Sequence, residues 1–499
     1  MSLTNGNIAQ SSSTSDRSRW IALVVLCVGM LMIVLDATVV NVALPKIQTD
    51  LGFSQSSLAW VINAYLITFG GLLLLAGRLG DLLGRRDVFM SGLALFTAAS
   101  LACGLAESQT VLVVARFIQG VGGALTSAVI LGMIVTMFPE PGEQAKAIGV
   151  YAFVASAGGS IGLLAGGAIT QAINWHWIFI VNLPIALITG VLALRYLQRD
   201  KGMGLSKGAD LPGAALIVGA LMTGVYAIVE ASNYGWASAH TLGFGAGAAA
   251  LLVGFVIRES RAAQPLVPLR IFRSRNLTGA NVAQALMVAG MYGMFFLGAL
   301  YLQKVLGFDS LEVGIAFLPV TAIIGTLSLG FSAKLNLRYG AKATLVPGLV
   351  AVGAGLALFS QISVDGSYWS EVLPAMVLVG IGAGLSFPSV MTLAMTGVRP
   401  EEAGLASGLV NTTLQVGGAL GLAVLATLST NRTTDLVNSG EGSHAALTSG
   451  YQLAFVVGAG LLVGAVVVAL SVIRSGPMAG EEVAVETAEA EPAFSSEAA

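Results

Sequence analysis

The sequence predicts an all-α polytopic membrane protein. Of its 499 residues, 56% are hydrophobic and only 10% are charged, and the mean hydropathy is +0.84. Average soluble domains carry about 25% charged residues. Two further observations support a membrane protein: apolar runs of roughly 20 residues, the length that a helix needs to cross a bilayer, recur along the chain, and basic residues gather in alternate connections between these runs.

The apolar runs predict fourteen membrane-spanning helices joined by short connections. The expected spans are 20–40, 58–76, 88–105, 111–138, 147–173, 177–196, 211–229, 241–257, 277–302, 313–333, 344–362, 372–395, 403–428 and 451–473. The first run is longer than the core of a signal peptide and lacks a small-residue cleavage site, so we expect it to remain as a span.

The basic residues predict the orientation of the chain. With fourteen spans and both termini in the cytoplasm, 20 Lys and Arg residues lie in cytoplasmic segments and only Lys46, Lys304 and Arg432 lie outside. Arg116 remains within a span. Because cytoplasmic loops of membrane proteins carry the excess of basic residues, we expect a multi-pass protein of the cytoplasmic membrane.

An internal repeat predicts the domain organisation. Ala147, Gly149, Gly158, Gly159 and Gly162 recur 259 residues later, and Gly120 and Gly122 recur 260 residues later. Duplicated halves are typical of transporters. We therefore expect a disordered N-terminal tail (1–19), a first six-helix bundle (20–200), two inserted helices with their loops (201–275), a second six-helix bundle (276–473) and a disordered acidic tail (474–499).

The segment 77–86, G-R-L-G-D-L-L-G-R-R, carries too much charge to lie inside a bilayer. Its glycines, Gly77, Gly80 and Gly84, allow a tight reversal of the chain. Asp81 is able to cap a helix or to pair with an arginine such as Arg85 or Arg86. The second copy, 333–342, stays basic but loses the aspartate.

Two charged residues within the apolar runs are candidates for proton coupling. Asp36 lies near the outer end of the first span, where a carboxylate is unfavourable unless it is paired or hydrated. It is either an interfacial capping group or a group that binds and releases a proton near neutral pH. Arg116 either ties polar groups of neighbouring helices together or changes partner when a carboxylate is protonated, and Gln119 shares its helix face.

Other candidates are helix-packing and cavity residues. Gly158, Gly162, Gly166 and Gly167 predict either close helix packing or a pliable gate helix. The side chains expected to line a polar or apolar substrate cavity, with interhelical packing as the alternative, are Tyr65, Gln119, Tyr292, Asn411, Thr412 and Gln415. Glu230, at the outer end of the seventh span, is expected to be interfacial, with contact to substrate or protons as the alternative.

The chain offers little for enzyme chemistry. Its three histidines lie in separate loops, its two cysteines lie in apolar runs, and it has no phosphate-binding loop. We therefore expect no cofactor and no metal, and a net charge of −2 indicates no nucleic-acid partner.

These stretches together resemble the fourteen-span drug:proton antiporters of the major facilitator superfamily, from about residue 20 to 473. The matching motifs are L-D-A-T-V-V-N-V-A-L-P at 35–45, the loop at 77–86, R-F-I-Q-G at 116–120, W-H-W-I-F-I-V-N-L-P at 175–184 and G-L-V-N-T-T-L-Q-V-G-G-A-L-G at 408–421. The resemblance implies proton coupling through Asp36 and Arg116 and a cytoplasmic gate in the loop 77–86.

One position departs from the family pattern, because Leu163 stands where the antiporter motif of the fifth span has proline. Without proline the helix keeps a backbone hydrogen bond and should bend less.

The resemblance implies proton-driven export of hydrophobic or amphipathic drugs by a monomer. The alternatives are a dedicated exporter of one endogenous metabolite or siderophore, a proton-driven importer, and a membrane-embedded enzyme or sensor.

Overall fold

The computed structural model describes residues 5–200, 202, 204, 210–263, 265–396 and 403–474. Within these ranges the chain is helical and contains no β-strand. Three basic residues of the topology argument (Lys201, Lys207 and Arg399) and the predicted tail beyond residue 474 lie outside the described residues.

Eight helices form the first bundle, with α2 and α7 being single turns. They are α1 (Asn5–Leu51), α2 (Gln55–Leu58), α3 (Trp60–Leu83), α4 (Arg85–Gly104), α5 (Gln109–Met137), α6 (Pro141–Ala172), α7 (Trp177–Ile180) and α8 (Asn182–Tyr196). Helices α3, α4 and α5 pack against one another, while α1 packs on α6 and α8.

A hairpin of two helices follows, and then the second bundle. The hairpin is α9 (Leu211–Tyr234) and α10 (Ala239–Arg261). The second bundle contains α11 (Arg275–Lys304), α12 (Ser310–Ala316), α13 (Leu318–Thr326), α14 (Ser332–Tyr339), α15 (Ala341–Phe359), α16 (Leu373–Met395), α17 (Ala403–Asn438) and α18 (Ser443–Ser471). A 3₁₀ turn (Leu269–Arg273) and π turns (Leu327–Phe331 and Tyr368–Val372) complete the described helical segments.

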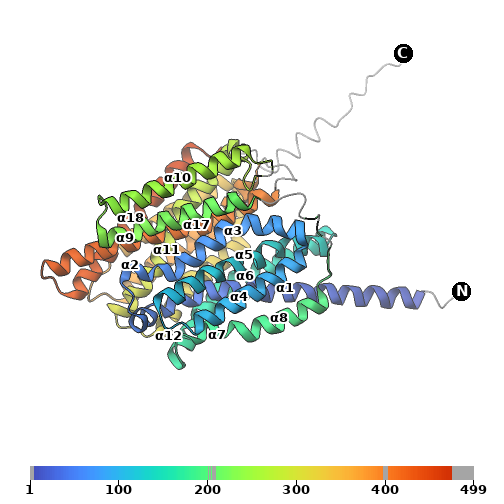
Figure 1. Cartoon of the computed structure of the whole chain (residues 1–499), viewed down its shortest axis with the longest axis horizontal. Helices are drawn as coiled ribbons and strands as arrows, with labels where there is room; N and C mark the ends of the chain where they lie inside the picture. Colours follow the sequence, from blue (N-terminus) through green and yellow to red (C-terminus); the bar gives the residue numbers. More distant parts are fainter. Residues whose placement is uncertain are drawn as a thin grey trace, which may run out of the picture.

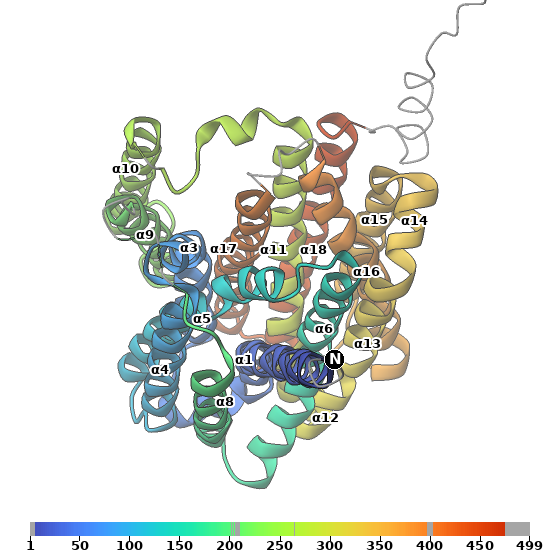
Figure 2. The ribbon, with the colours of Figure 1, turned by 90° about the vertical axis from the view of Figure 1, so that its right-hand side faces the viewer.

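The long helices lie roughly parallel to one another (Figure 1). Twelve of the described helical segments are long and apolar enough to cross a membrane, and two shorter apolar segments, Ile161–Ala172 and Ser310–Thr326, accompany them. The hairpin lies at the edge of the molecule beside α3, with α10 outermost (Figure 2). Helix α9 packs on α3 of the first bundle and on α17 of the second.

Two sequence predictions about helix limits need correction. Helix α1 begins at Asn5, so most of the tail that we expected to be disordered continues the helix; each residue added to an existing helix gains a hydrogen bond without a new nucleation step. The span expected at 313–333 is divided into α12, α13 and α14, because Pro319 begins a new helix and a π turn follows at Leu327–Phe331.

The two bundles are joined across one end of the molecule, and a cavity opens between them toward the other, where α3 and α17 stay in contact. We call the end that holds the start of α1, the α3–α4 turn and the end of α18 the terminal face. At the opposite face, Gln303 Nε2 donates to Val42 O at 3.0 Å and Lys304 Nζ donates to Gln48. These bonds join α11 of the second bundle to α1 of the first.

A cavity of about 1030 Å³ lies between the bundles and reaches the terminal face. Its lining includes Phe69, Gly77, Arg78, Asp81, Arg85, Gly132 and Tyr151 from the first bundle, Asp210 beside the hairpin, Pro265, Leu266 and Pro268 from the following linker, and Phe387, Gly408, Asn411 and Gln415 from the second bundle. The structure is therefore open toward the terminal face and closed toward the opposite one.

Candidate functional site

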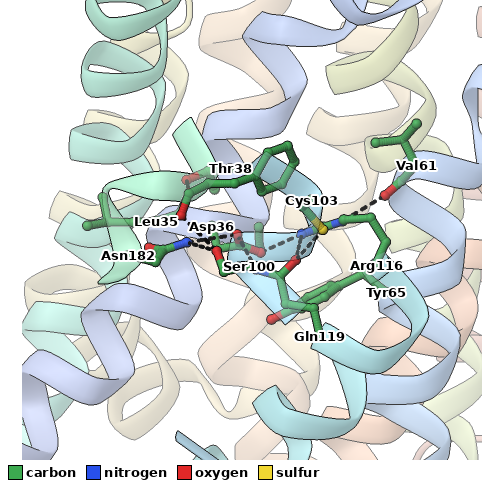
Figure 3. Close-up of polar contacts among 12 residues, drawn as sticks. Leu35, Asp36, Thr38, Val61, Tyr65, Ser100, Cys103, Arg116, Gln119 and Asn182 are labelled. Carbon is green, nitrogen blue, oxygen red and sulfur yellow. Dashed lines mark hydrogen bonds and ion pairs between the residues drawn. The ribbon is translucent and has the colours of Figure 1, made fainter. Parts of the chain in front are cut away.

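Asp36 and Arg116 form an ion pair inside the first bundle. Arg116 Nη1, on α5, lies 2.6 Å from Asp36 Oδ2, on α1, and both residues are 1% exposed (Figure 3). A buried pair of this kind is compensated only when its remaining donors and acceptors are also satisfied. Asp36 is therefore not the interfacial carboxylate that we kept as an alternative.

Neutral amides satisfy the second oxygen of the carboxylate. Gln119 Nε2 donates to Asp36 Oδ1 at 2.7 Å, and Asn182 Nδ2, on α8, donates to the same oxygen at 3.1 Å. Asn182 also donates to Ser100 Oγ, on α4, at 3.0 Å. These residues, Asp36, Arg116, Gln119, Asn182 and Ser100, are the buried polar cluster, to which four helices of the first bundle contribute.

Arg116 is held by more than its carboxylate. Its Nη1 donates to Gln119 Oε1 at 2.8 Å, and its Nε donates to Val61 O at 2.9 Å. The guanidinium also lies 4.4 Å from the ring centroid of Tyr65 and 5.7 Å from that of Phe179, as cation–π contacts require. The fixed fork of donors explains why arginine suits this position better than lysine.

The local packing that brings the cluster together depends on a glycine of the R-F-I-Q-G motif. A Cβ on Gly120 would lie 2.5 Å from Tyr65 O and would overlap Thr68 Oγ1. The absence of that Cβ lets α5 approach α3 closely, and Thr68 Oγ1 donates to Phe117 O at 2.9 Å across the contact. Arg116 and Gln119, three residues apart, then point together toward α1.

The buried polar cluster is separated from the cavity. The described residues that line the cavity include none of its five members. Tyr65 stacks on Phe69 with ring centroids 5.6 Å apart, and Phe69 lines the cavity. An aromatic pair therefore stands between the ion pair and the space that opens to the terminal face.

The structure divides the predicted cavity residues into two groups. Asn411 and Gln415 line the cavity, and Tyr292 adjoins it through a hydrogen bond to Gln415 Oε1 at 3.2 Å. Gln119 and Tyr65, which we expected in the cavity, belong to the buried polar cluster and its aromatic cover. Helical spacing placed Gln119 on the face of Arg116, and Tyr65 was expected as an aromatic side chain of an apolar pocket. Neither expectation distinguished a buried face from an open one.

The charged segment 77–86, in which only Gly84 lies outside α3 and α4, has an ion pair and side-chain hydrogen bonds within the first bundle. Arg85 Nη2 lies 3.2 Å from Asp81 Oδ1, and Arg85 Nη1 donates to Gly132 O at 2.8 Å. Arg86 Nη2 donates to Leu194 O, near the end of α8, at 2.7 Å. Gly84 has a φ of 101°, which explains a glycine at the reversal.

The loop has a partner that sequence reasoning missed. Asp200, after α8, accepts from the backbone N–H groups of Arg85 at 2.9 Å and Arg86 at 3.3 Å. It thereby caps α4, and a carboxylate at a helix start is favourable. Arg199 next to it lies 2.8 Å from Asp87. Since the loop and Asp200 are more than 100 residues apart, spacing alone carried no signal.

The glycines of α6 form packing surfaces. A Cβ on Gly158 would lie 3.0 Å from Val34, and one on Gly166 would lie 2.5 Å from Val39, so these glycines face α1. Gly162 faces Thr38 in the same stripe. Gly167 instead contacts Ser310 at the start of α12, which makes it part of the closed face.

Leu163 is buried, 2% exposed, at the same contact between the bundles. Its carbonyl oxygen would lie 2.6 Å from a Cβ on Gly314 of α12. Helix α6 runs from Pro141 to Ala172 without an internal proline.

Other sequence candidates lie away from these sites. Glu230 is half-buried and accepts a bond from Asn233 at 2.9 Å. Cys27 and Cys103 are free and buried. The described part of the chain contains no group of three metal-ligating side chains. Asn182 and Ser100 were missed, although a lone amide within the apolar stretch I-F-I-V-N-L-P was the signal available for Asn182.

Two helical bundles around a cavity that reaches one face only, with an ion pair buried beside it, define a membrane transporter rather than an enzyme. The model of the Major Facilitator Superfamily matches residues 26–422. The chain belongs to this superfamily.

Several similar proteins are named as resistance or export proteins. The puromycin resistance protein pur8 of Streptomyces alboniger is 39% identical over 473 residues, covering 94% of each chain. The cephamycin export protein CmcT of Amycolatopsis lactamdurans is 37% identical, covering 87% of this chain and 88% of that protein. The fold is similar to an inward-facing bacterial homologue of the human lysosomal transporter Spinster, with a TM-score of 0.66 and 19% identity, covering 91% of this chain and 96% of that one.

Proposed function

We propose that this protein exports hydrophobic or amphipathic drugs across the cytoplasmic membrane by exchanging them for protons. The observation that carries the proposal is the buried pair of Asp36 and Arg116, at 2.6 Å, beside a cavity from which it is sealed. A charged pair inside a membrane protein is unfavourable to maintain and marks ion pathways. The family membership supports transport, and the names of the relatives support export.

Proton exchange would act through the partner of Arg116. When a proton binds Asp36, the carboxyl group becomes neutral and its attraction for Arg116 largely disappears, leaving a buried cation without its partner. Arg116 must then rearrange against Gln119, Val61 O and Tyr65, which belong to α5 and α3. Those helices also line the cavity, so the proton and the substrate act on the same packed elements.

The cavity suits a substrate of mixed polarity. Its lining is apolar at Phe69 and Phe387, with neutral polar groups at Asn411 and Gln415. Such pockets bind by apolar contact and use a few polar groups for orientation. Asp81 and Arg85 at the mouth are placed to close it when the bundles rock, as the cytoplasmic gate of an alternating-access cycle.

The topology that we propose has fourteen spans, with the terminal face and both termini in the cytoplasm. Helix α6 and the broken α12–α13 supply the two spans beyond the twelve that length and composition support. Basic residues such as Arg78, Arg85 and Arg86 lie on this face, in accordance with the excess of positive charge inside. A monomer with protons as coupling ion and no cofactor completes the proposal.

A dedicated exporter of one metabolite is the second candidate. The names of two relatives refer to single antibiotics, puromycin and cephamycin. A narrow substrate profile in the assay below would favour this candidate.

The test is ethidium export by the purified protein in lipid vesicles with an imposed proton gradient. We expect wild-type export against the dye gradient to stop with an uncoupler. Asp36→Asn should lose this uphill export but retain downhill dye exchange, since exchange needs no net proton movement. Glu230→Gln is the matched control and should transport as wild type does. Uphill export by Asp36→Asn at the wild-type rate would remove Asp36 from the coupling path.

A further inference from the structure

A pair of buried carboxylates lies where the hairpin meets the linker to α11. Asp210 precedes α9 and is 4% exposed, and Glu259 lies in the last turn of α10 and is 3% exposed. Together with Asp36 and Arg116, they are the buried charged side chains of the described ranges. The mechanism proposed above uses neither of them.

One oxygen of each carboxylate accepts hydrogen bonds from neighbouring parts of the chain. Asp210 Oδ1 accepts from Gly213 N at 3.0 Å, capping α9, and from Arg258 Nε at 3.0 Å. Glu259 Oε2 accepts from Val267 N at 2.9 Å. Glu259 therefore fastens the linker (residues 265–268) to the end of the hairpin.

The remaining oxygens both lie beside Gly213. Asp210 Oδ2 and Glu259 Oε1 are buried and have no hydrogen-bond partner among the described residues. Both point to the same place, since a Cβ on Gly213 would lie 2.7 Å from Asp210 Oδ2 and 2.8 Å from Glu259 Oε1. A glycine leaves the space between the two oxygens open.

Within the described residues, a guanidinium is bonded to one of the two carboxylates. Arg258 is the cation bonded to the pair, and its side chain is 45% exposed. Arg78 and Asp81 of α3 line the same cavity mouth with opposite charges. Two carboxylates that share a site do not both ionise readily, and one proton between them removes the repulsion and supplies the missing hydrogen bond.

We propose that Asp210 and Glu259 form a proton-binding pair, in which one carboxyl group donates its O–H to the other carboxylate across Gly213. The pair is a second proton site, in the inserted hairpin and apart from Asp36. Loss of the proton leaves two facing carboxylates, and their repulsion loosens Glu259 from Val267 N.

The linker connects this site to the movement of the bundles. Leu266 and Val267 are buried in a small apolar cluster with Leu75 of α3 and with Ala406 and Leu409 of α17. The cluster therefore lies on the seam between the two bundles at the terminal face. Linker residues also line the cavity mouth, so the protonated pair holds a segment that must shift whenever that mouth changes shape.

The proton is tested directly by pH-difference infrared spectroscopy of the purified protein in lipid vesicles. The wild type should show a carboxyl O–H signal, recognised by its shift in D₂O, that disappears as the pH rises. Asp210→Asn and Glu259→Gln should each remove the same part of this carboxyl signal, and Glu230→Gln should leave that part unchanged. The same part of the carboxyl signal should persist in Asp36→Asn, which distinguishes this site from the proposed coupling residue. Identical spectra for Glu259→Gln and Glu230→Gln would overturn the proposal.

The linker is tested by the reactivity of a cysteine at Val267. Val267→Cys should be alkylated by a soluble maleimide increasingly fast at alkaline pH. At the same alkaline pH, the double variant Val267→Cys with Glu259→Gln should be alkylated at least about tenfold more slowly, because a shift of one pKa unit corresponds to a factor of ten in an equilibrium constant. Comparison at equal pH cancels the ionisation of the thiol itself. The unmodified chain, with Cys27 and Cys103 buried, measures the background.

The replacements are close in shape, because a glutamine at 259 keeps an oxygen for Val267 N and an amide to donate to Asp210 Oδ2. Should Glu259→Gln unfold on size exclusion, Val267→Cys with Asp210→Asn carries the same expectation of protection. Equal alkylation rates with and without the carboxylate pair at every pH would refute the proposal that the protonated pair holds the linker.

Discussion

The two bundles use related helices in different ways. Gly120 and Gly122 of α5 correspond to Gly380 and Gly382 of α16 at a spacing of 260 residues, and all four pack closely on a neighbouring helix. The same spacing places Met376 at the position of Arg116, and Val379 at the position of Gln119. All of these side chains are buried. The first bundle thus has a charged interior where the second has an apolar one.

The charged loops differ in the same way. Lys342, the last residue of the segment 333–342, corresponds to Arg86, the last residue of the segment 77–86. Each donates to backbone carbonyls near the end of the last helix of its bundle. Lys342 donates to Leu470 O at 3.0 Å and to Ile473 O at 2.6 Å, and Arg86 donates to Leu194 O at 2.7 Å. The ion pair of Asp81 and Arg85 has no counterpart, because Leu337 and Ala341 occupy those positions.

The comparison separates what the fold needs from what transport needs. Close glycine contacts and a basic cap on the last helix recur in both halves, which indicates a structural purpose. The buried ion pair and the loop ion pair occur once. In the second bundle, the polar contacts near the cavity are neutral, such as Tyr292 with Gln415 at 3.2 Å and Thr413 with Asn281 at 2.8 Å. We infer that protonation acts on the first bundle and the hairpin, and that the second bundle contributes neutral recognition.

The largest expected effect comes from making the first bundle resemble the second. Arg116→Met leaves Asp36 buried without its cation, and breaking such a pair destabilises a protein by about 3–5 kcal/mol. The double variant Asp36→Asn with Arg116→Met should recover a large part of this loss, as measured by thermal unfolding in detergent.

Met376→Leu is the matched control in the second bundle. A volume-conserving apolar exchange should change stability by less than about 1.5 kcal/mol. If Arg116→Met were as mild as this control, the ion pair would not be the difference between the bundles.

An intermediate effect is expected at the paired glycines. A Cβ at Gly120 would lie 2.5 Å from Tyr65 O, whereas one at Gly380 would lie 3.1 Å from both Val320 O and Ile323 Cβ. Gly120→Ala should therefore destabilise by about 1–3 kcal/mol through overpacking. Gly380→Ala should be nearly neutral, because alanine favours the helix by up to about 1 kcal/mol. Equal melting temperatures for the two variants would show that α5 approaches its neighbour no more tightly than α16 does.

The smallest effect is expected where the bundles agree. Arg86→Ala and Lys342→Ala each remove a cation from the end of a helix, which contributes about 0.3–1 kcal/mol. Both variants should unfold slightly earlier and by similar amounts, since both side chains make the same kind of bond. A large loss for one of them alone would break the equivalence of the two caps.

Periodicity and composition predicted much of the architecture and part of the site. The apolar runs located the long helices, because burying or lipid-exposing a full helix demands a continuous apolar stretch. Asp36, Arg116 and Gln119 were found because charge and amides are rare inside such stretches. The division of the span at 313–333 was not predicted, although Pro319 was a visible signal for a new helix start. The helical start of α1 was not predicted, since helix propagation leaves no distinctive sequence pattern.

Asp36 and Arg116 were thus identified from the chain, but not as partners, and Asn182, Ser100, Asp210 and Glu259 were not identified. Asp36 and Arg116 are 80 residues apart, and Asp210 and Glu259 occupy opposite legs of a hairpin. Spacing along one helix places a side chain on a face, whereas the packing of separate helices decides which faces meet and which are sealed from water. Only the folded chain therefore distinguished the buried polar cluster from the open cavity and brought two carboxylates together across Gly213, where the missing side chain leaves room for a shared proton.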